Sequence, residues 1–328
     1  MKGYWFLVIG LLAALFAGCG GGGKTEKDEA APVRTLEVPV SLDGFETAET
    51  IGLIMAEQHD YFAKAGLTVT TLAPLSPTRT IHYVASGGDL IGVAHGPQVV
   101  LSREKGIPVV ILGSLVSHST AAMIWPQKSD INSIADLKGK TIAIPGLSFQ
   151  RSFLQYVLSR AGLTLDDVEV KTVRNDLVAA LVKGQADAIF GGSGNVEGAD
   201  LESRGFQPVV TSVRKLGIPD YDELVLVARA DRTKEEPGLM HDFVAATARG
   251  AAAATERPKS ALQALDAVGE TNPEASPKAR AAEVEQTLPL LSKSGQINSD
   301  QLKRLVDWMH EQGMIRRKMP IETLLAQP

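Results

Sequence analysis

An alternation of short apolar runs with helix-like segments constrains the fold of this chain more than any other feature. The first apolar runs of strand length stand at residues 36–42, 67–72, 90–94 and 109–115. The segments between them carry apolar residues at helical spacing. Strands that alternate with helices pack as a mainly parallel sheet with right-handed crossovers. The first third of the chain therefore predicts an α/β unit.

A second α/β unit follows the first. Its strand-like runs are residues 141–144, 168–172, 186–190 and 207–212. The chain leaves the first unit near residues 121–127 and returns to it near residues 217–228. We therefore predict an α/β protein of two lobes, with two mixed, mainly parallel sheets joined by a two-strand hinge.

The two crossings set the predicted lobe boundaries. One lobe comprises residues 35–122 together with 224–328, and the other comprises residues 123–223. A hinge of this kind places a cleft between the lobes, and the cleft can close around a ligand.

The amino terminus has the pattern of a secretory signal. One lysine precedes an apolar segment at residues 4–17, which is too short for a comfortable membrane span. The only cysteine, Cys19, follows an Ala-Gly pair, an arrangement that resembles a bacterial lipobox. We predict a signal peptide at residues 1–18 and a flexible tether at residues 19–34. A lipidated Cys19 would anchor the tether at the extracytoplasmic face of the cell membrane. The alternative is an incidental thiol.

Composition and motifs limit the classes of function. Hydrophobic residues make up 44% of the 328 positions, and the formal charge is −5 with Lys and Arg spread along the chain. Nucleic-acid binding therefore has little support. The six histidines are scattered without metal-ligand spacing, and neither a serine elbow nor a phosphate-binding loop appears. We expect no enzyme activity, no metal and no cofactor.

The stretch from residue 187 to residue 198 combines an apolar strand, a glycine turn and three polar side chains. Ligands of open α/β sheets bind outside the carboxyl ends of the strands, often against a helix N-terminus. Ser193, Asn195 and Glu197 follow such a strand, and their hydrogen bonds can orient a ligand. We predict that these residues line the site, while a plain strand-to-helix turn remains the alternative.

Several short motifs, each weak alone, occur in an order typical of one family. They include Ala65-Gly66-Leu67, Val84-Ala85-Ser86-Gly87, Arg103-Glu104-Lys105-Gly106-Ile107-Pro108, Asp136-Leu137-Lys138-Gly139-Lys140, Asn195-Val196-Glu197-Gly198 and Gly217-Ile218-Pro219-Asp220-Tyr221. Across residues 36–290 the chain resembles the periplasmic solute-binding proteins of bacterial ABC importers. It is most similar to binders of thiamine-pyrimidine precursors, which have riboflavin-binding relatives.

This resemblance carries several implications. It implies the type II periplasmic-binding-protein fold, a small-molecule ligand, ABC permease subunits as partners and a monomer. The family is related to yeast thiamine-pyrimidine synthases, which carry a cysteine-rich segment and use iron. Here the only cysteine lies in the lipobox-like segment. The resemblance therefore implies a binding protein rather than an enzyme.

Departures from the family pattern bear on the ligand. Gly44, Thr47 and Thr50 stand where the pyrimidine binders usually have Trp, Asn and His, and Ser193-Gly194 replaces a Tyr-Trp pair. Each missing aromatic ring would bury about 150–250 Å². We therefore expect room for a larger ring system and rank riboflavin ahead of formyl-aminopyrimidine or hydroxymethylpyrimidine. A sulfonate ligand and a non-transport, adhesive surface lipoprotein are further alternatives.

The predicted ligand-binding residues come from loops of both units. They are Asp43, Phe45, Glu46, His95, Gln98, Phe149, Asn175, Ser193, Asn195, Glu197 and Tyr221. Asp43 and Glu46 would accept ligand hydrogen bonds, or are simply solvated. Phe45 would stack on a ligand ring or cap the core, and Tyr221 would stack as the lobes close. Acidic and amide side chains, rather than Arg or Lys, favour an uncharged ligand that donates hydrogen bonds.

Overall fold

The computed structural model describes residues 35–73, 78–173, 176–268 and 275–326. The predicted signal peptide, the tether with Cys19 and the candidate residue Asn175 lie outside these residues. No helix in the described ranges is both long enough and apolar enough to cross a lipid bilayer.

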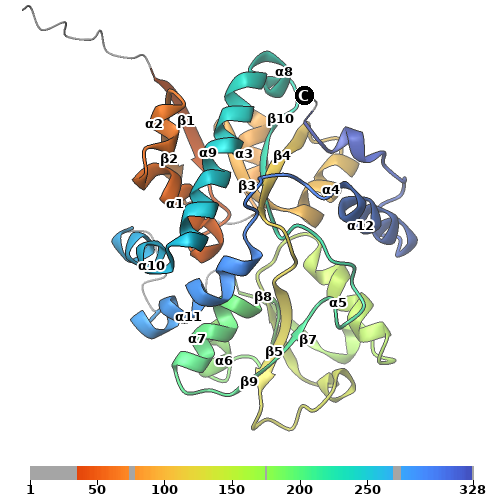
Figure 1. Cartoon of the computed structure of the whole chain (residues 1–328). Helices are drawn as coiled ribbons and strands as arrows, with labels where there is room; N and C mark the ends of the chain where they lie inside the picture. The colour runs from red at the N-terminus through yellow and green to blue at the C-terminus, as the bar shows by residue number, and fades with distance from the viewer. Residues whose placement is uncertain (1–34, 74–77, 174–175, 269–274, 327–328) are drawn as a thin grey trace, which may run out of the picture. The chain divides into compact units, whose positions relative to one another are not determined.

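Two five-stranded sheets organise residues 35–326 (Figure 1). The first sheet has the order β2-β1-β3-β10-β4. Its strands are β1 (Leu36–Ser41), β2 (Leu67–Leu72), β3 (Ile91–His95), β4 (Val109–Val116) and β10 (Leu224–Arg229). β1 pairs in parallel with β2 and β3, whereas β10 runs antiparallel to β3 and β4.

The second sheet repeats this arrangement with the order β7-β6-β8-β5-β9. Its strands are β5 (Ala121–Pro126), β6 (Thr141–Ile144), β7 (Glu169–Thr172), β8 (Ala188–Ser193) and β9 (Pro208–Ser212). β6 pairs in parallel with β7 and β8, and β5 runs antiparallel to β8 and β9. Each sheet thus contains one reversed strand, in agreement with the predicted mixed, mainly parallel sheets.

The reversed strand of each sheet is the one that the chain enters directly after it crosses from the other sheet. Residues 117–120 lead from β4 to β5, and residues 213–223 lead from β9 to β10. The structure therefore contains two crossing segments between its sheets. The lobe boundaries drawn from the sequence remain a prediction.

Helices cover both sheets and largely follow the sequence pattern. They are α1 (Ile51–Gln58), α2 (Tyr61–Lys64), α3 (Thr80–Ser86), α4 (Gly96–Glu104), α5 (Gln150–Ser159), α6 (Leu177–Val182), α7 (Ala199–Ser203), α8 (Arg232–Glu235), α9 (Pro237–Glu256), α10 (Pro258–Ala267), α11 (Pro277–Thr287) and α12 (Ser299–Glu311). Apolar residues at helical spacing predict a single helix over residues 48–64, but this helix is interrupted at Asp60, which has a left-handed φ of 56°. Asp tolerates this conformation better than most residues.

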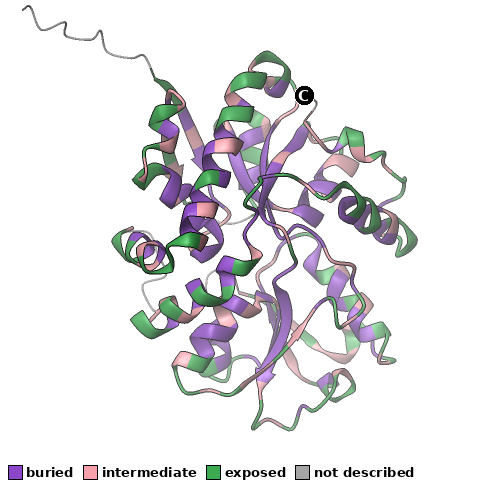
Figure 2. Cartoon of the chain, viewed as in Figure 1, coloured by how far each residue is buried: buried purple, intermediate pink, exposed green. Residues whose placement is uncertain are grey.

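The hydrophobic core follows from the strand and helix patterns (Figure 2). Strands β3, β5 and β10 are buried along almost their whole length. Helix α9 packs against α1 so closely that Gly250 leaves no room for a side chain, because an added Cβ would lie 2.0 Å from the carbonyl oxygen of Gly52. Burial of this apolar surface is the main stabilising contribution to the fold.

An aromatic cluster connects helix α5, beside the second sheet, to helix α12 near the carboxyl terminus. The Trp308 ring of α12 meets Phe153 at 5.1 Å and Tyr156 at 5.0 Å between ring centroids, in edge-on geometry. Tyr221, on the returning crossing segment, joins the same cluster. Trp308 thus packs in the core, and α12 bridges elements of both sheets.

Candidate ligand-binding site

A cavity of about 220 Å³ lies where loops of both sheets meet. From the first sheet it receives the loop after β1 and the end of β3. From the second it receives the loop after β6, the starts of α5 and α6, and the end of β8; helix α11 closes one side. The lining includes Asp43, Gly44, Phe45, Glu46, Thr47, Glu49, His95, Leu147, Gln150, Asp176, Leu177, Gly191, Gly192, Ser193, Glu197, Asp200, Arg280 and Glu283. The carboxyl ends of strands are the expected position for a ligand site in such sheets.

The glycine turn after β8 forms one wall of this cavity. Gly191 has a φ of +83°, and a Cβ there would lie 2.8 Å from Gln150 Nε2. Gln150 Oε1 accepts the backbone N–H groups of Gly146 and Leu147, both at 2.9 Å. Gln150 therefore joins the loop after β6 to the glycine turn. Glycine is favoured at position 191 because its φ is left-handed, and a Cβ there would also approach this amide.

Directly after the glycines, the chain forms a π-helical turn, η4 (Gly194–Gly198), before α7 begins. The sequence predicted an ordinary helix from Asn195 onward. A π turn is rare and often marks a functional site. Here it directs Glu197 back toward the end of β8, where its Oε2 accepts the backbone N–H of Ser193 at 2.6 Å.

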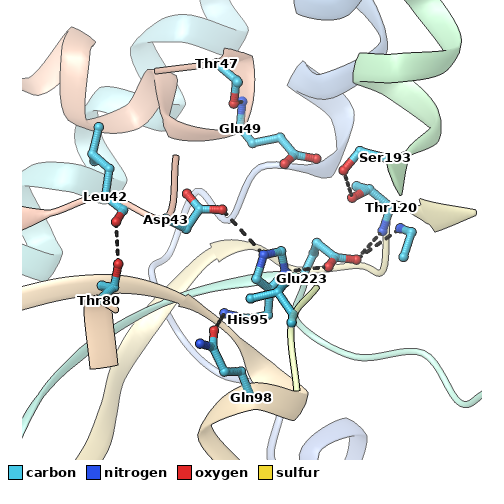
Figure 3. A network of polar contacts seen from close by, with 12 residues as sticks. Leu42, Asp43, Thr47, Glu49, Thr80, His95, Gln98, Thr120, Ser193 and Glu223 are labelled. Carbon is cyan, nitrogen blue, oxygen red and sulfur yellow. Dashed lines mark hydrogen bonds and ion pairs between the residues drawn. The ribbon is translucent and has the colours of Figure 1, made fainter. Parts of the chain in front are cut away.

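His95 lies between two carboxylates at the floor of the cavity (Figure 3). Its Nδ1 bonds to Glu223 Oε1 at 2.8 Å, and its Nε2 lies 3.4 Å from Asp43 Oδ2. Burial alone lowers the pKa of His95, but the hydrogen bonds and charges of Asp43 and Glu223 outweigh this and raise it to about 10. His95 is therefore an imidazolium at neutral pH.

Glu223 also ties the two crossing segments together. Its Oε2 accepts the backbone N–H groups of Thr120 at 2.8 Å and Ala121 at 3.1 Å. Nearby, Asp220 Oδ1 accepts the backbone N–H and the hydroxyl of Ser119, each at 2.9 Å. Two carboxylates of the returning segment thus hold the outgoing segment, and His95 connects this point to the cavity through Asp43.

Asn195 and Glu49 form a second polar contact between elements of the two sheets. Asn195 Nδ2 donates to Glu49 Oε1 at 3.1 Å and to Thr287 Oγ1 at 2.7 Å. Burial, followed by the negative charge of Glu223, raises the pKa of Glu49 to about 8. Glu49 is therefore mostly a neutral carboxylic acid near pH 7.

Acidic side chains outnumber basic ones in the lining. Among the described lining residues they are Asp43, Glu46, Glu49, Asp176, Glu197, Asp200 and Glu283. Burial raises the pKa of both Glu197 and Glu283 to about 7. The basic lining residues are His95, which is paired as above, and Arg280, which bonds to Asp266 and to the carbonyl oxygen of Ala275, each at 2.6 Å. The cavity therefore offers mainly hydrogen-bond acceptors to a ligand.

The structure brings several predicted residues together and leaves others outside the lining. Those at the cavity are Asp43, Phe45, Glu46, His95, Ser193 and Glu197. Asn195 is only 6% exposed and acts behind the cavity wall through Glu49. Asn175 lies outside the described residues. Contact of any of these residues with a ligand remains a prediction.

Three further predicted residues are packed away from the cavity. Gln98 is buried at the start of α4, where its Oε1 accepts the His95 backbone N–H at 3.5 Å. Phe149 is buried between His95 and Phe153. Tyr221 is 1% exposed within the aromatic cluster, so its ring has no face to offer a ligand in this conformation. Aromatic packing holds Phe149 and Tyr221, and a backbone hydrogen bond accompanies the burial of Gln98. A loop position in the sequence does not reveal such contacts.

Sequence reasoning also missed Glu49, Asp176 and Glu283 as lining residues. Glu283 accepts the backbone N–H of Ala48 at 2.6 Å across 235 positions of sequence. No local pattern signals such a contact. Glu49 could have been suspected from its place in the first loop, where acidic residues cluster.

The fold and the cavity define a solute-binding protein of the SsuA/THI5 type. The alkanesulfonate-binding protein SsuA of Xanthomonas axonopodis pv. citri matches with a TM-score of 0.70 at 17% identity, over 89% of this chain and 98% of that one. The predicted periplasmic-binding-protein fold is thus confirmed. The family model described as NMT1/THI5 like matches residues 47–261, and the chain belongs to this family.

Curated relatives refine this assignment. The formylaminopyrimidine-binding protein of Halalkalibacterium halodurans is 32% identical over 260 residues, which cover 79% of this chain and 78% of the relative. The putative thiamine biosynthesis protein of Haemophilus influenzae is 26% identical over 87% of this chain and 90% of its own length.

Two more distant relatives bear on the remaining alternatives. The riboflavin-binding protein RibY of Chloroflexus aurantiacus is 27% identical over 54% of this chain and 50% of its own length. A 4-amino-5-hydroxymethyl-2-methylpyrimidine phosphate synthase of Legionella pneumophila is 27% identical over 65% of this chain and 67% of its own length. The family thus contains proteins named as binders and proteins named as enzymes.

Proposed function

We propose that this protein captures an aminopyrimidine precursor of thiamine in the cavity and delivers it to an ABC permease. The observation that carries the proposal is the set of carboxyl groups from both sheets around a cavity of about 220 Å³. An aminopyrimidine donates hydrogen bonds through its amino group, and carboxylates are strong acceptors for such donors. The 32% identity to a formylaminopyrimidine-binding protein supports the same ligand class.

The size of the cavity favours one ring over three. Sites for drug-sized ligands usually measure roughly 300–1,000 Å³, and this one measures about 220 Å³. The sequence ranked riboflavin first because large aromatic residues are absent. However, the apolar side chains of Phe45, Leu147 and Leu177 line part of the cavity. The match to the riboflavin-binding relative covers only half of that relative's length. We therefore rank the aminopyrimidine first and riboflavin second.

A sulfonate ligand has less support than either. An anion needs Arg or Lys side chains free to pair with it. At this cavity Arg280 is already bonded to Asp266, and the imidazolium of His95 is already bonded to Glu223. An anion would also meet like-charge repulsion from those lining carboxyl groups that are ionised.

Transport rather than catalysis or adhesion fits the arrangement best. Polar groups from both sheets reach one cavity. A ligand in this cavity contacts both lobes in the closed form but only one lobe in an open form. Binding therefore shifts the population toward the closed form. Under this proposal Cys19 carries the lipid anchor, and the protein works as a monomer at the extracytoplasmic face. The two lobes move about residues 117–120 and 213–223.

A thermal-shift panel on the purified protein tests the ligand class. The panel contains formyl-aminopyrimidine, amino-hydroxymethylpyrimidine, riboflavin and taurine. A ligand at 100 times its Kd stabilises by about 2.7 kcal/mol, which corresponds to a Tm increase of about 5–10 °C for a domain of this size class. We expect this increase with a pyrimidine and none with taurine.

Two matched variants locate the binding event. Glu197→Gln changes a cavity residue, whereas Glu202→Gln changes an exposed glutamate on the adjacent helix α7. The first is expected to weaken pyrimidine binding and the second to leave it unchanged. A Tm increase with riboflavin and none with either pyrimidine would overturn the assignment of ligand.

A further inference from the structure

We propose that Glu49 is the specificity-determining residue of this site and that it recognises the ligand as a neutral carboxylic acid. In this role it donates one hydrogen bond to a ring nitrogen and accepts another from the adjacent amino group. The inference rests on the proposed function and names the group that reads the aminopyrimidine.

The position of Glu49 suits a fixed recognition group. It lies in the short 3₁₀ turn η1 (Ala48–Thr50), whose Thr47 cap accepts the Glu49 backbone N–H at 3.2 Å. The residue is 6% exposed and lines the cavity. Asn195, itself held by Thr287, donates to Glu49 Oε1 and fixes the carboxyl group from the opposite element. Figure 3 shows this group extending from its turn toward Thr120 and Ser193.

The surroundings of Glu49 favour its neutral form. Burial raises the pKa of Glu49 most, and the negative charges of Glu223, on the returning crossing segment, and of Asp43, in the loop after β1, raise it further. His95, the neighbouring cation, is engaged by these same two carboxylates. Behind the turn, α11 presents Glu283, bonded to the Ala48 backbone. Hydrogen bonds from Asn195 and Thr120 lower the pKa of Glu49 but do not outweigh burial. Glu49 forms no ion pair among the described residues.

A neutral carboxyl group is the complement of an aminopyrimidine edge. It presents one donor and one acceptor side by side, whereas a carboxylate presents acceptors only. The edge of a 4-aminopyrimidine presents a ring nitrogen that accepts and an amino group that donates, also side by side. A carboxylate would place an oxygen lone pair against the lone pair of the ring nitrogen. The carboxyl group of Glu49 and the ring nitrogen therefore share one proton. Loss of that proton removes the hydrogen bond between them.

The test is the pH dependence of Kd for 4-amino-5-hydroxymethyl-2-methylpyrimidine, measured by calorimetry between pH 6.5 and pH 9.5. Glu49 has a pKa of about 8, so the protonated form predominates below this pH and must be regained for binding above it. One linked proton makes Kd of the natural protein rise about tenfold per pH unit above pH 8.

Two variants of Glu49 separate hydrogen bonding from titration. Glu49→Gln keeps a donor beside an acceptor and cannot ionise, so its Kd should stay within about threefold of the neutral-pH value across the range. Glu49→Leu lacks both groups and should bind at least about tenfold more weakly at every pH. Glu57→Gln, an exposed glutamate on the helix that follows the turn, serves as the control and should follow the natural protein.

The outcomes distinguish this inference from the proposed function. If the natural protein binds the pyrimidine with a Kd that is flat to pH 9.5, or if Glu49→Gln loses as much affinity as Glu49→Leu, the role of Glu49 is refuted while the ligand assignment stands. If no pyrimidine binds at any pH to a protein that melts cooperatively, both proposals fall. Melting curves at each pH confirm that all variants are folded.

Discussion

Replacing Glu223 with Gln removes the charge on which the floor of the cavity depends. The carboxylate is 2% exposed and bonds to the His95 imidazolium and to the backbone N–H groups of Thr120 and Ala121. The amide of the introduced Gln keeps one oxygen as an acceptor, but its NH₂ group faces hydrogen-bond donors that the carboxylate oxygen had accepted from. Breaking a buried ion pair while leaving its partner charged typically costs about 3–5 kcal/mol.

The pKa of His95 gives an independent magnitude. It rises from 6.5 to about 10 in the folded protein. At 1.36 kcal/mol per pKa unit, protonation of His95 contributes on the order of 5 kcal/mol to stability. Because the folded pKa is raised, this stabilisation is complete below about pH 6.5 and is lost progressively as pH rises to about 10.

Denaturation with guanidinium chloride at pH 6.5, 8 and 10 measures both effects. We expect Glu223→Gln to lower the free energy of unfolding by about 3–5 kcal/mol at pH 6.5, with a difference from the natural protein that shrinks toward pH 10. Asp242→Asn, in an exposed pair with His241, serves as control and should change stability by less than about 0.5 kcal/mol. Equal stability of the natural protein and Glu223→Gln at pH 6.5 would refute this account of the network.

Two predictions concern packing. Gly250→Ala should destabilise the protein by about 1–3 kcal/mol because its Cβ would meet backbone atoms of α1. The control Gly238→Ala, on the same helix, meets nothing within 4 Å and should stabilise the protein slightly. Thermal melting compares the two variants, and equal Tm values would contradict the close contact. Trp308→Ala should cost about 3–5 kcal/mol in chemical denaturation by leaving a cavity between α12 and α5. A loss no larger than that of the exposed control His310→Ala would show that this cluster does not stabilise the fold.

Several boundaries of the fold could be predicted because they depend on local patterns. Strands β2 and β6 begin and end where apolar periodicity predicts, at residues 67–72 and 141–144. Differences arise where tertiary contacts or special backbone conformations intervene. Asp60 adopts a left-handed φ that divides one predicted helix into two, and the chain from Gly194 to Gly198 forms a π turn.

The candidate site was only partly predictable. Asp43, His95 and Glu197, predicted from loops at strand ends, line the cavity because strand ends meet at one edge of a sheet, and their contact with a ligand stays a prediction. The same reasoning placed Tyr221 there, although its ring is packed against Phe153 in the core. A loop position determines where a backbone lies but leaves undetermined whether the side chain faces the cavity or the core.

The sequence by itself determined the alternation of strands and helices, the two α/β units and the membership of a family of solute-binding proteins, because periodicity and motif order are properties of neighbouring residues. Only the tertiary structure decided the chemistry of the cavity. Glu283 reaches Ala48 across 235 positions, and Asn195 reaches Glu49 across 146. The burial of these carboxyl groups, and hence their raised pKa values, arises when distant elements exclude water from a shared space.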